Sequence, residues 1–377
     1  MITSFGPWSS GIDSHSCPHL STFWKRRMAM LPCLAKDSGA PTRRQVLHAG
    51  LLSLGLAAWP TLRPGRAVEP GAVPGQDDKA KGMLYVHAIF TLITQEELER
   101  GEGAERGGIV ALDPESGEWR MAHPRNLDVF SISPDGTRLA FGDHETRDGY
   151  LRLTNVKIAE FGRPDAPVET VCEFGDWAVW SGDGSELIVP LLTTELGKDP
   201  RRWEHWRMNA DGTNRVKLPI PESHCIMAWS PDGQWIATAS PDHPDARGNH
   251  VYIIRPDGSG LRRMSDEDIS AHASFSPDSR RLAFVERRSI VTVNLDGTDR
   301  RSFTPAEESA GSYTDTAWSP DGRSVACTAM NFDRDPEVRR NQEPDYRILI
   351  IDTEDGAART LRVPGALFLS RLYWLSG

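Results

Sequence analysis

One short motif recurs five times along this chain and restricts its fold more than any other feature. Each copy consists of an apolar residue, Ser, Pro or Gly, Asp, and finally Gly or Ser; the copies begin at Ile132, Trp180, Trp229, Phe275 and Trp318. Their first residues are separated by 48, 49, 46 and 43 positions, which is the length of a four-stranded sheet with its turns. The period therefore predicts one propeller blade for each motif.

The residues around each motif favour strands over helices. In Pro-Asp-Gly the proline fixes φ at the first corner, the aspartate bonds its own backbone, and the glycine accepts a positive φ, so a tight turn forms. A short apolar run follows each turn, as at residues 139–141 and 282–284, and such runs are typical of strands that are buried on both faces. A second hairpin follows in most repeats, with Asp-Gly at its tip. Each repeat therefore provides four strands.

The two ends of the repeat region predict how the propeller closes. Residues 371–377 repeat the opening strand of a blade and then stop, and the three missing strands are expected at residues 84–89, 109–112 and 119–122. Pairing between the C-terminal and N-terminal strands would remove free edges that invite aggregation. The expected fold class is all-β: a six-bladed β-propeller with four-stranded blades over residues 83–377, closed by pairing of its N- and C-terminal strands.

The motif carries a resemblance to a known family. Trp-Ser-Pro-Asp-Gly, intact at residues 229–233 and 318–322, resembles the hallmark of TolB-type six-bladed propellers, which are WD-repeat-like. The resemblance covers nearly all of the chain after residue 82 and implies a role through protein contacts at the cell envelope. Serine peptidases of the prolyl oligopeptidase group carry related propellers, with the nucleophile in a separate α/β-hydrolase domain. No Gly-x-Ser-x-Gly elbow occurs in this sequence.

Residues 1–67 are predicted to be a leader with an export signal, and residues 68–82 a linker. The sequence Thr-Arg-Arg-Gln-Val-Leu-His resembles the twin-arginine export signal through its pair Arg43 and Arg44, although Val46 and His48 depart from the usual pattern. Such signals precede an apolar run. The resemblance implies export of a protein that has already folded.

An apolar run follows the arginine pair. It covers residues 46–62, contains a proline, and is short for a bilayer span. Residues 65–67, Gly-Arg-Ala, form a small-x-small site that is suited to a signal peptidase. We therefore expect a periplasmic or secreted protein without a transmembrane anchor once the signal is cleaved.

The charge balance excludes one class of partner. Residues 1–82 carry a net charge of +5, and the remaining residues carry −15. A region this acidic does not bind a phosphate backbone by charge alone, so no nucleic-acid partner is expected. A protein partner or a component of the cell envelope is expected instead.

Sites on repeat proteins usually arise where the repeats differ, because the repeated core carries stability. The recurrent aromatic and aspartate residues of the motif are therefore expected to be structural. Long insertions are predicted on the face opposite the tight turns; they cover residues 91–107, 193–202, 241–249 and 331–345. We expect this face to carry the binding function, although insertions of this kind are also tolerated on a surface without any function.

One polar residue for each blade is expected at the mouth of the central channel, where the innermost strands begin. These residues are Asp128, Asp176, His224, His272, Asp315 and Arg371. Histidine and aspartate bind divalent metals or act as acid and base, whereas propeller mouths are also polar because water fills them. We predict a ligand-binding ring without assigned catalytic residues. A divalent metal is compatible with it, but no cofactor is predicted.

The sequence leaves two main functions open. The first is an exported, non-catalytic propeller that binds or scaffolds a protein or envelope component through its insertion-rich face. The second is a metal-assisted polysaccharide lyase or glycoside-acting enzyme with its site at the channel mouth, since some propellers of this kind are similar to oligogalacturonate lyases. A lone sensor domain is a third hypothesis. We favour the first, because no His-x-His or His-Glu-x-x-His motif occurs.

Overall fold

A computed structural model describes the repeat region. The described residues are 82–90, 106–124, 127, 130–147, 150–173, 175, 177–192, 203–240, 249–269, 272–304, 312–331 and 345–376. Within these ranges the chain forms strands and turns without a helix, so none of them holds a helix that could cross a membrane. The predicted leader with Arg43 and Arg44, and all of the predicted linker except Gly82, lie outside the described residues.

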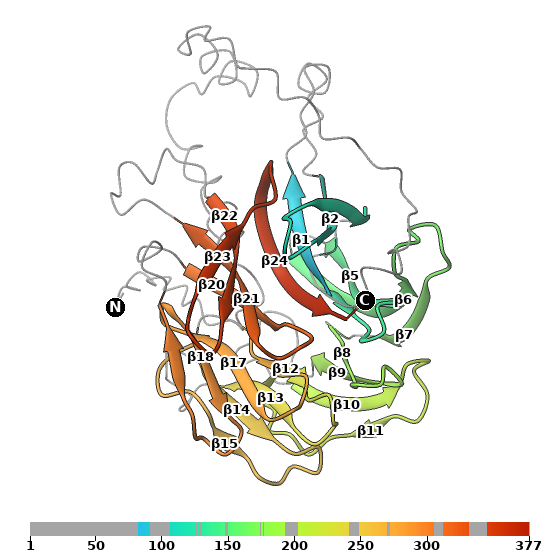
Figure 1. Ribbon diagram of the computed structural model, residues 1–377. Helices are drawn as coiled ribbons and strands as arrows, with labels where there is room; N and C mark the ends of the chain where they lie inside the picture. Colours follow the sequence, from blue (N-terminus) through green and yellow to red (C-terminus); the bar gives the residue numbers. More distant parts are fainter. Residues whose placement is uncertain are drawn as a thin grey trace, which may run out of the picture. The chain divides into compact units, whose positions relative to one another are not determined.

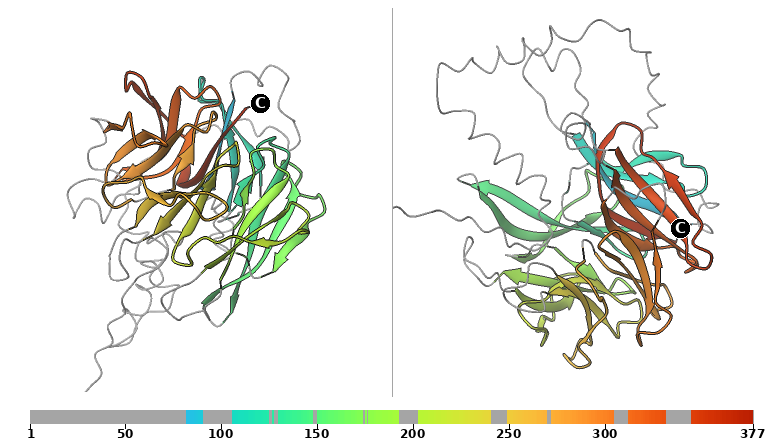
Figure 2. Two further views of the ribbon diagram at one scale, coloured as in Figure 1. Left: turned by 90° about the horizontal axis from the view of Figure 1, so that it is seen from below. Right: turned by 90° about the vertical axis from the view of Figure 1, so that its left-hand side faces the viewer.

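The strands form six four-stranded antiparallel sheets that surround a common axis (Figures 1 and 2). Blade 1 contains β24 (Ala366–Leu375), β1 (Met83–Phe90), β2 (Arg106–Leu112) and β3 (Trp119–His123), from the axis outward. Blade 2 contains β4 (Phe130–Ile132), β5 (Arg138–Arg147), β6 (Tyr150–Glu160) and β7 (Glu169–Glu173). Blade 3 contains β8 (Val179–Trp180), β9 (Glu186–Leu192), β10 (Trp203–Asn209) and β11 (Val216–Lys217).

The remaining blades follow the same order. Blade 4 contains β12 (Cys225–Trp229), β13 (Ile236–Ser240), β14 (His250–Ile254) and β15 (Arg262–Arg263). Blade 5 contains β16 (Ser274–Phe275), β17 (Arg281–Glu286), β18 (Ser289–Asn294) and β19 (Arg301–Phe303). Blade 6 contains β20 (Ser312–Trp318), β21 (Ser324–Asn331), β22 (Asp345–Asp352) and β23 (Ala358–Leu361). The all-β, six-bladed fold is therefore confirmed.

The closure of the ring is confirmed as well. β24 pairs antiparallel with β1, from Met83 opposite Leu375 to Phe90 opposite Ala366. The first blade is therefore assembled from both ends of the repeat region, and β24 covers the edge of β1 that would otherwise face the channel.

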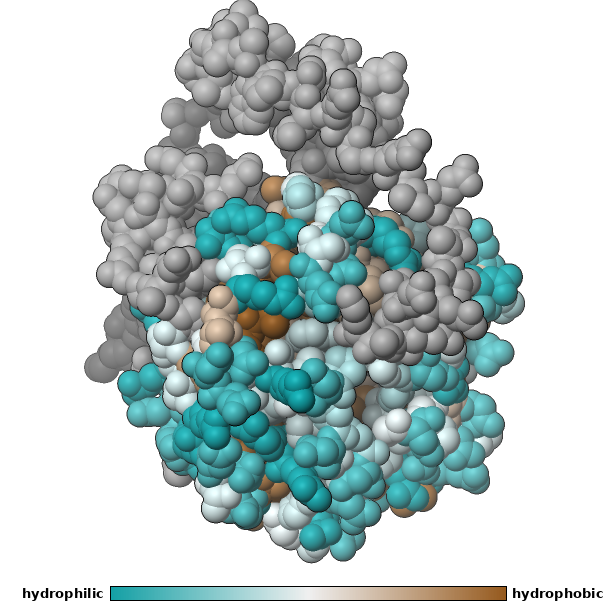
Figure 3. All heavy atoms as spheres, viewed as in Figure 1, coloured by the Kyte–Doolittle hydropathy of each residue, from teal (hydrophilic) through white to brown (hydrophobic). Residues whose placement is uncertain are grey.

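The hydrophobic core lies between the blades. Six clusters of buried residues each join neighbouring blades, such as Phe130, Leu139 and Tyr85 between blades 1 and 2, and the same holds for the other five pairs. Because a blade buries its faces only against its neighbours, the ring is stable only as a whole. On the face shown in Figure 3, the described surface is mainly hydrophilic.

Each motif forms a turn that its own serine and aspartate hold. In blade 4, Ser230 Oγ donates to Asp232 Oδ1 at 2.6 Å and accepts from Trp235 N at 2.9 Å, while Asp232 Oδ1 accepts from Gln234 N at 3.0 Å. Gly233 has a φ of 73°. The corresponding serine–aspartate bonds recur in the other four motifs. These residues stabilise the turn and are not available as a site, as the sequence predicted.

Two departures from the motif coincide with contacts between neighbouring turns. Gly182 replaces the proline of the motif in blade 3, and a Cβ at this position would lie 2.0 Å from the carbonyl oxygen of Pro231 in blade 4. Ser279 replaces the last glycine in blade 5 despite a φ of 59°, and its Oγ accepts from Asp232 N at 3.0 Å. Close approach of the turns therefore explains both substitutions.

Restoring a side chain at the first of these positions should destabilise the ring. We expect Gly182→Ala to lower the free energy of unfolding by about 1–3 kcal/mol, since the new Cβ forces two turns apart. Pro134→Ala, at the same motif position in blade 2, is the control and should cost less than about 1 kcal/mol. Urea denaturation measures both. Equal stability of Gly182→Ala and wild type would contradict the steric explanation.

Candidate functional site

The central channel holds a cavity of about 440 Å³ that is lined by residues of the innermost strands and motif turns of blades 1, 2, 4, 5 and 6. At one end it is lined by the prolines of four motif turns: Pro134, Pro231, Pro277 and Pro320. At the other end it is lined by His272, Asp315 and Arg371. The channel thus has one apolar mouth and one polar mouth, because each inner strand runs from the polar face to a motif turn.

The polar mouth shares its face with the strand ends that flank two of the predicted insertions. Phe90 pairs with Ala366 at the start of β24, and Met330 pairs with Ser312 at the start of β20. Strands therefore end here beside residues 91–105 and 332–344. Residues 91–105, 193–202, 241–248 and 332–344 of the predicted insertions lie outside the described residues, and the remaining end residues of the insertions belong to strands or a bridge.

Three of the predicted ring residues converge at this mouth from three blades. His272 Nδ1 lies 2.7 Å from Asp315 Oδ1, and Arg371 Nη1 lies 3.1 Å from His272 Nε2. Since arginine only donates, Nε2 accepts from it, and the ring proton resides on Nδ1 and is donated to Asp315. The backbone N–H of Arg371 donates to Asp315 Oδ2 at 2.9 Å. The trio consequently joins blades 5, 6 and 1.

The backbone at Arg371 turns its side chain toward His272. In the pairing of β24 with β1, Val86 lies opposite Leu372 and His87 opposite Ser370, so Arg371 is the extra residue of a β-bulge. Its φ of 56° is left-handed, which costs an ordinary residue about 1 kcal/mol or more. Bulges commonly re-aim a side chain beside a functional site. The bonds to Asp315 and His272 hold this conformation.

Asp315 carries the negative charge of the trio. Burial alone would raise the pKa of its carboxyl group, but the hydrogen bond from His272, the Arg371 cation and the Arg371 N–H outweigh burial and lower the pKa to about 2. The side chain is 9% exposed. Asp315 is therefore ionised throughout the neutral range, with bonds to both carboxylate oxygens.

His224 lies elsewhere. It is buried within blade 4, where its Nδ1 is 2.8 Å from Thr238 Oγ1 and its ring meets Tyr252 edge to face at 5.0 Å between centroids. It does not line the channel cavity. Asp128 and Asp176 lie outside the described residues, so the structure brings together three of the six predicted residues.

Sequence reasoning missed the residues that support the trio. Thr316 Oγ1 donates to the carbonyl oxygen of His272 at 3.1 Å, and Asp315 N donates to Thr328 Oγ1 at 3.2 Å. Tyr373 donates from its hydroxyl group to the Phe130 carbonyl at 2.8 Å. Thr316 directly follows the predicted ring residue Asp315, and a polar residue at such a position is the sequence signal that could have indicated it.

Metal ligation finds no support in the described part of the chain. No group of three or more His, Cys, Asp and Glu side chains there could hold a metal ion. In the trio, the positively charged Arg371 guanidinium lies beside the His272 imidazole. A metal ion bound there would have to displace the hydrogen bonds that both carboxylate oxygens of Asp315 accept. A divalent metal in this protein remains an expectation from the sequence alone.

Comparison with known proteins identifies the fold. Residues 222–243 match the family model described as WD40: WD domain, G-beta repeat. The structure is similar to TolB from Acinetobacter baumannii, with a TM-score of 0.54 and 14% identity, over 80% of this chain and 68% of that one. The chain folds as a TolB-like WD-repeat propeller. No curated protein matches it in sequence.

Two further structures share this TolB-like fold. A protein assigned as TolB from Agrobacterium tumefaciens matches with a TM-score of 0.50 and 17% identity, over 78% of this chain and 91% of that one. A chain in a nidogen/laminin complex matches with a TM-score of 0.52 and 10% identity, over 78% of this chain and 98% of that one. At these identities the likeness establishes the propeller architecture.

Removing the charge of Asp315 should weaken the junction of three blades. We expect Asp315→Asn to lower the free energy of unfolding by about 3 kcal/mol at neutral pH, because a buried charge network loses its anion. The wild-type contribution should fade as the pH falls from about 4 toward 2, where the carboxylate protonates in the folded state. Urea denaturation at several pH values measures both.

Asp296→Asn, in an exposed turn, is the matched control and should change stability little. Equal losses in the two variants would contradict a special role for Asp315.

Two buried histidines should make the TolB-like propeller sensitive to mild acid. Burial lowers the pKa of His224 to about 4. Burial also lowers the pKa of His205 to about 4; the hydrogen bond of His205 to the His224 carbonyl opposes this effect and the nearby His224 side chain adds to it. Between pH 6.5 and 4 the unfolded chain therefore binds protons that the folded chain does not, so stability should fall as the pH decreases. The pH dependence of urea denaturation tests this, and a His224→Gln variant should show a shallower slope. An unchanged slope would contradict the assignment.

Proposed function

We propose that this chain is an exported, non-catalytic binding protein of the cell envelope, which holds a protein or an envelope component at the polar mouth of its channel. The observation that carries the proposal is the trio of His272, Asp315 and Arg371 from three blades. These polar groups meet at one end of a 440 Å³ cavity. They lie on the face where strands end beside two of the predicted insertions.

Binding fits the trio better than catalysis does. Both ring nitrogens of His272 and both carboxylate oxygens of Asp315 are engaged within the trio. A general base needs a free lone pair within reach of the proton it removes. The trio instead forms a fixed polar surface at the channel mouth. It includes the Arg371 guanidinium, a type of group that binds carboxylate or phosphate oxygens on a partner.

The solved relatives are consistent with a binding role. Two of them are described as TolB, and a third belongs to a complex named for two proteins, nidogen and laminin. A propeller presents a rigid mouth on which loops and inner strands supply side chains. The propeller alone can therefore bind another molecule, without a further domain.

Arg371 gives the sharpest test of binding at the polar mouth. We expect a tagged full-length protein, expressed in its own host without the native copy, to retain one dominant partner after crosslinking in cells. Arg371→Ala should reduce that capture at least about tenfold, because a charged donor at the mouth is lost. Arg280→Ala, an exposed arginine beside a motif turn at the other mouth, is the control. Equal capture by both variants would overturn the assignment of the mouth.

Export requires its own test. Residues 1–82 fused to a reporter that folds before export should direct it out of the cytoplasm, and replacing Arg43 and Arg44 together by Lys should retain it inside. Replacing Arg26 and Arg27 by Lys is the matched control, because this pair lies outside the predicted signal and should leave export intact. Fractionation measures the distribution. Continued export of the Arg43/Arg44 variant would contradict a twin-arginine signal.

A further inference from the structure

A second polar cavity lies between blades 5 and 6, on the face of the motif turns. Its volume is about 490 Å³, and it is lined by Arg281 and Arg301 of blade 5 and by Gly322, Arg323, Asp352, Thr353 and Glu354 of blade 6. Apart from Gly322, every lining residue is polar or charged. It does not share a lining residue with the channel cavity.

The same joint between blades 2 and 3 shows why the cavity between blades 5 and 6, here called the groove, is open. Arg138 and Arg281 both stand five residues after the motif serine, and each lies over the motif tryptophan of the next blade, at 4.7 Å from the Trp180 ring and 5.2 Å from the Trp318 ring. In blade 2, Arg138 Nη2 donates across the joint to the carbonyl oxygen of Gly184 at 2.5 Å. The equivalent carbonyl in blade 6 belongs to Gly322. No such bond joins it to Arg281 among the described residues.

Arg281 is left with unused donors. Its Nη2 donates to Thr292 Oγ1 at 2.8 Å, whereas its Nε is buried without a hydrogen-bond partner among the described residues. The nearest carboxylate oxygen, Asp299 Oδ2, is 4.0 Å away, beyond hydrogen-bond distance. The side chain is only 19% exposed. A largely buried guanidinium with one hydrogen bond is unusual, because buried polar groups are normally satisfied.

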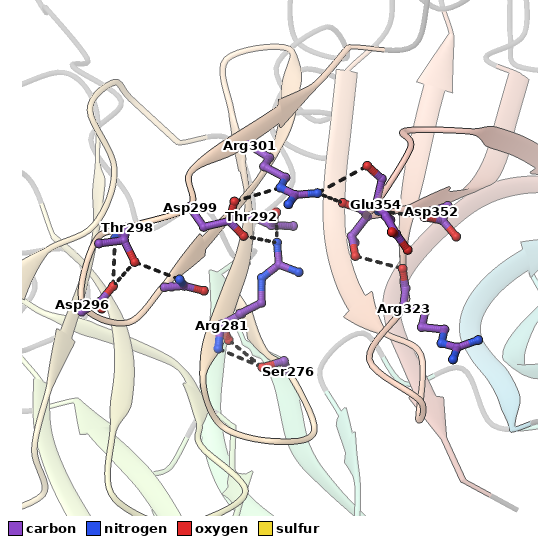
Figure 4. A network of polar contacts seen from close by, with 12 residues as sticks. Ser276, Arg281, Thr292, Asp296, Thr298, Asp299, Arg301, Arg323, Asp352 and Glu354 are labelled. Carbon is purple, nitrogen blue, oxygen red and sulfur yellow. Dashed lines mark hydrogen bonds and ion pairs between the residues drawn. The ribbon is translucent and has the colours of Figure 1, made fainter.

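A second cation reinforces the first. Arg301 Nε donates to Asp299 Oδ1 at 3.0 Å, and its Nη1 donates to the Thr353 carbonyl at 2.9 Å, which fixes the guanidinium across the groove (Figure 4). Burial holds the pKa of Arg281 below its ordinary value; Asp299 opposes this effect and the Arg301 cation adds to it. Asp299 is thus the carboxylate that lies within 4.0 Å of both arginines, and Asp278 adds a weaker opposing charge near Arg281.

The blade 6 side of the groove provides the opposing charges. Asp352 Oδ1 accepts from the backbone N–H of Glu354 at 2.7 Å, so it serves its own turn, and Glu354 is exposed. The Arg323 guanidinium is directed away from Arg281 and Arg301 in Figure 4. The cationic part of the groove is therefore formed by Arg281 and Arg301 on blade 5. Residues 272–304, which include this blade, hold six arginines and four carboxylates, whereas the repeat region as a whole is acidic.

We propose that Arg281 and Arg301 form a binding site for a phosphate group, either free or as a phosphate monoester. Guanidinium groups offer paired N–H donors that match the oxygens of phosphate, and two of them from one blade can hold it against the groove wall. The site is separate from the channel mouth and does not rest on the function proposed for it.

Calorimetric titration of the full chain at low ionic strength tests the proposal, with inorganic phosphate and glycerol 3-phosphate as separate probes. We expect binding of at least one probe, weakened at least about tenfold by Arg281→Gln and by Arg301→Gln. Asp299→Asn should bind more tightly, because the competing carboxylate is gone. Tighter binding of one probe identifies whether the free ion or the monoester is the natural form.

The equivalent arginine provides the matched control. Arg138→Gln removes a stacked arginine at another blade joint and should leave phosphate binding unchanged. Thermal unfolding of each variant verifies that it is folded. If Arg281→Gln does not fold, Arg301→Gln still tests the site. Absence of binding in the folded wild type would overturn the proposal, and so would equal affinity in the wild type and both Gln variants.

Discussion

The antiparallel pairing of β24 with β1 is the interaction on which the rest of the structure depends. Every hydrophobic cluster lies between two blades, so each blade needs neighbours on both sides. β24 supplies Leu369 and Leu372 to the cluster with blade 6, and Tyr373 and Leu375 to the cluster with blade 2. Loss of this one strand would open two cores at once, which makes folding of the ring a single cooperative event.

Hydrogen bonds between innermost strands, or between the residues that flank them, accompany these cores around the ring. Trp180 Nε1 donates to the Ser131 carbonyl between blades 2 and 3, and Trp318 Nε1 donates to the Ser274 carbonyl between blades 5 and 6. The other joints use different residues for the same purpose: Tyr373 to Phe130, Trp177 to Ile226, Asp232 to Ser279, and Arg371 to Asp315. The trio at the channel mouth is thus one of the hydrogen-bonded links between neighbouring blades.

The sequence predicted the features that follow from a repeated local rule. The motif turn depends on residues within six positions of one another, so blade number, strand order and closure could all be derived from it. The orientation of a single side chain depends on tertiary contacts instead. Nothing in the sequence around Arg371 announces a bulge, and His224 starts its strand like His272 yet packs into its own blade beside Tyr252. Gly182 looks like a degraded motif until the Pro231 carbonyl is seen next to it.

The place where the ring closes also determines how this protein can be rearranged. Met83 and Leu375 are paired neighbours in one sheet, at the end of the sheet where hairpins of the other blades turn. A short loop between them would connect β24 to β1 as an ordinary hairpin, and the chain could then be opened in another blade as a circular permutant. Because Leu375 and Ser376 line the channel cavity toward its proline-lined mouth, a tag attached after them would emerge at the opposite mouth from His272, Asp315 and Arg371.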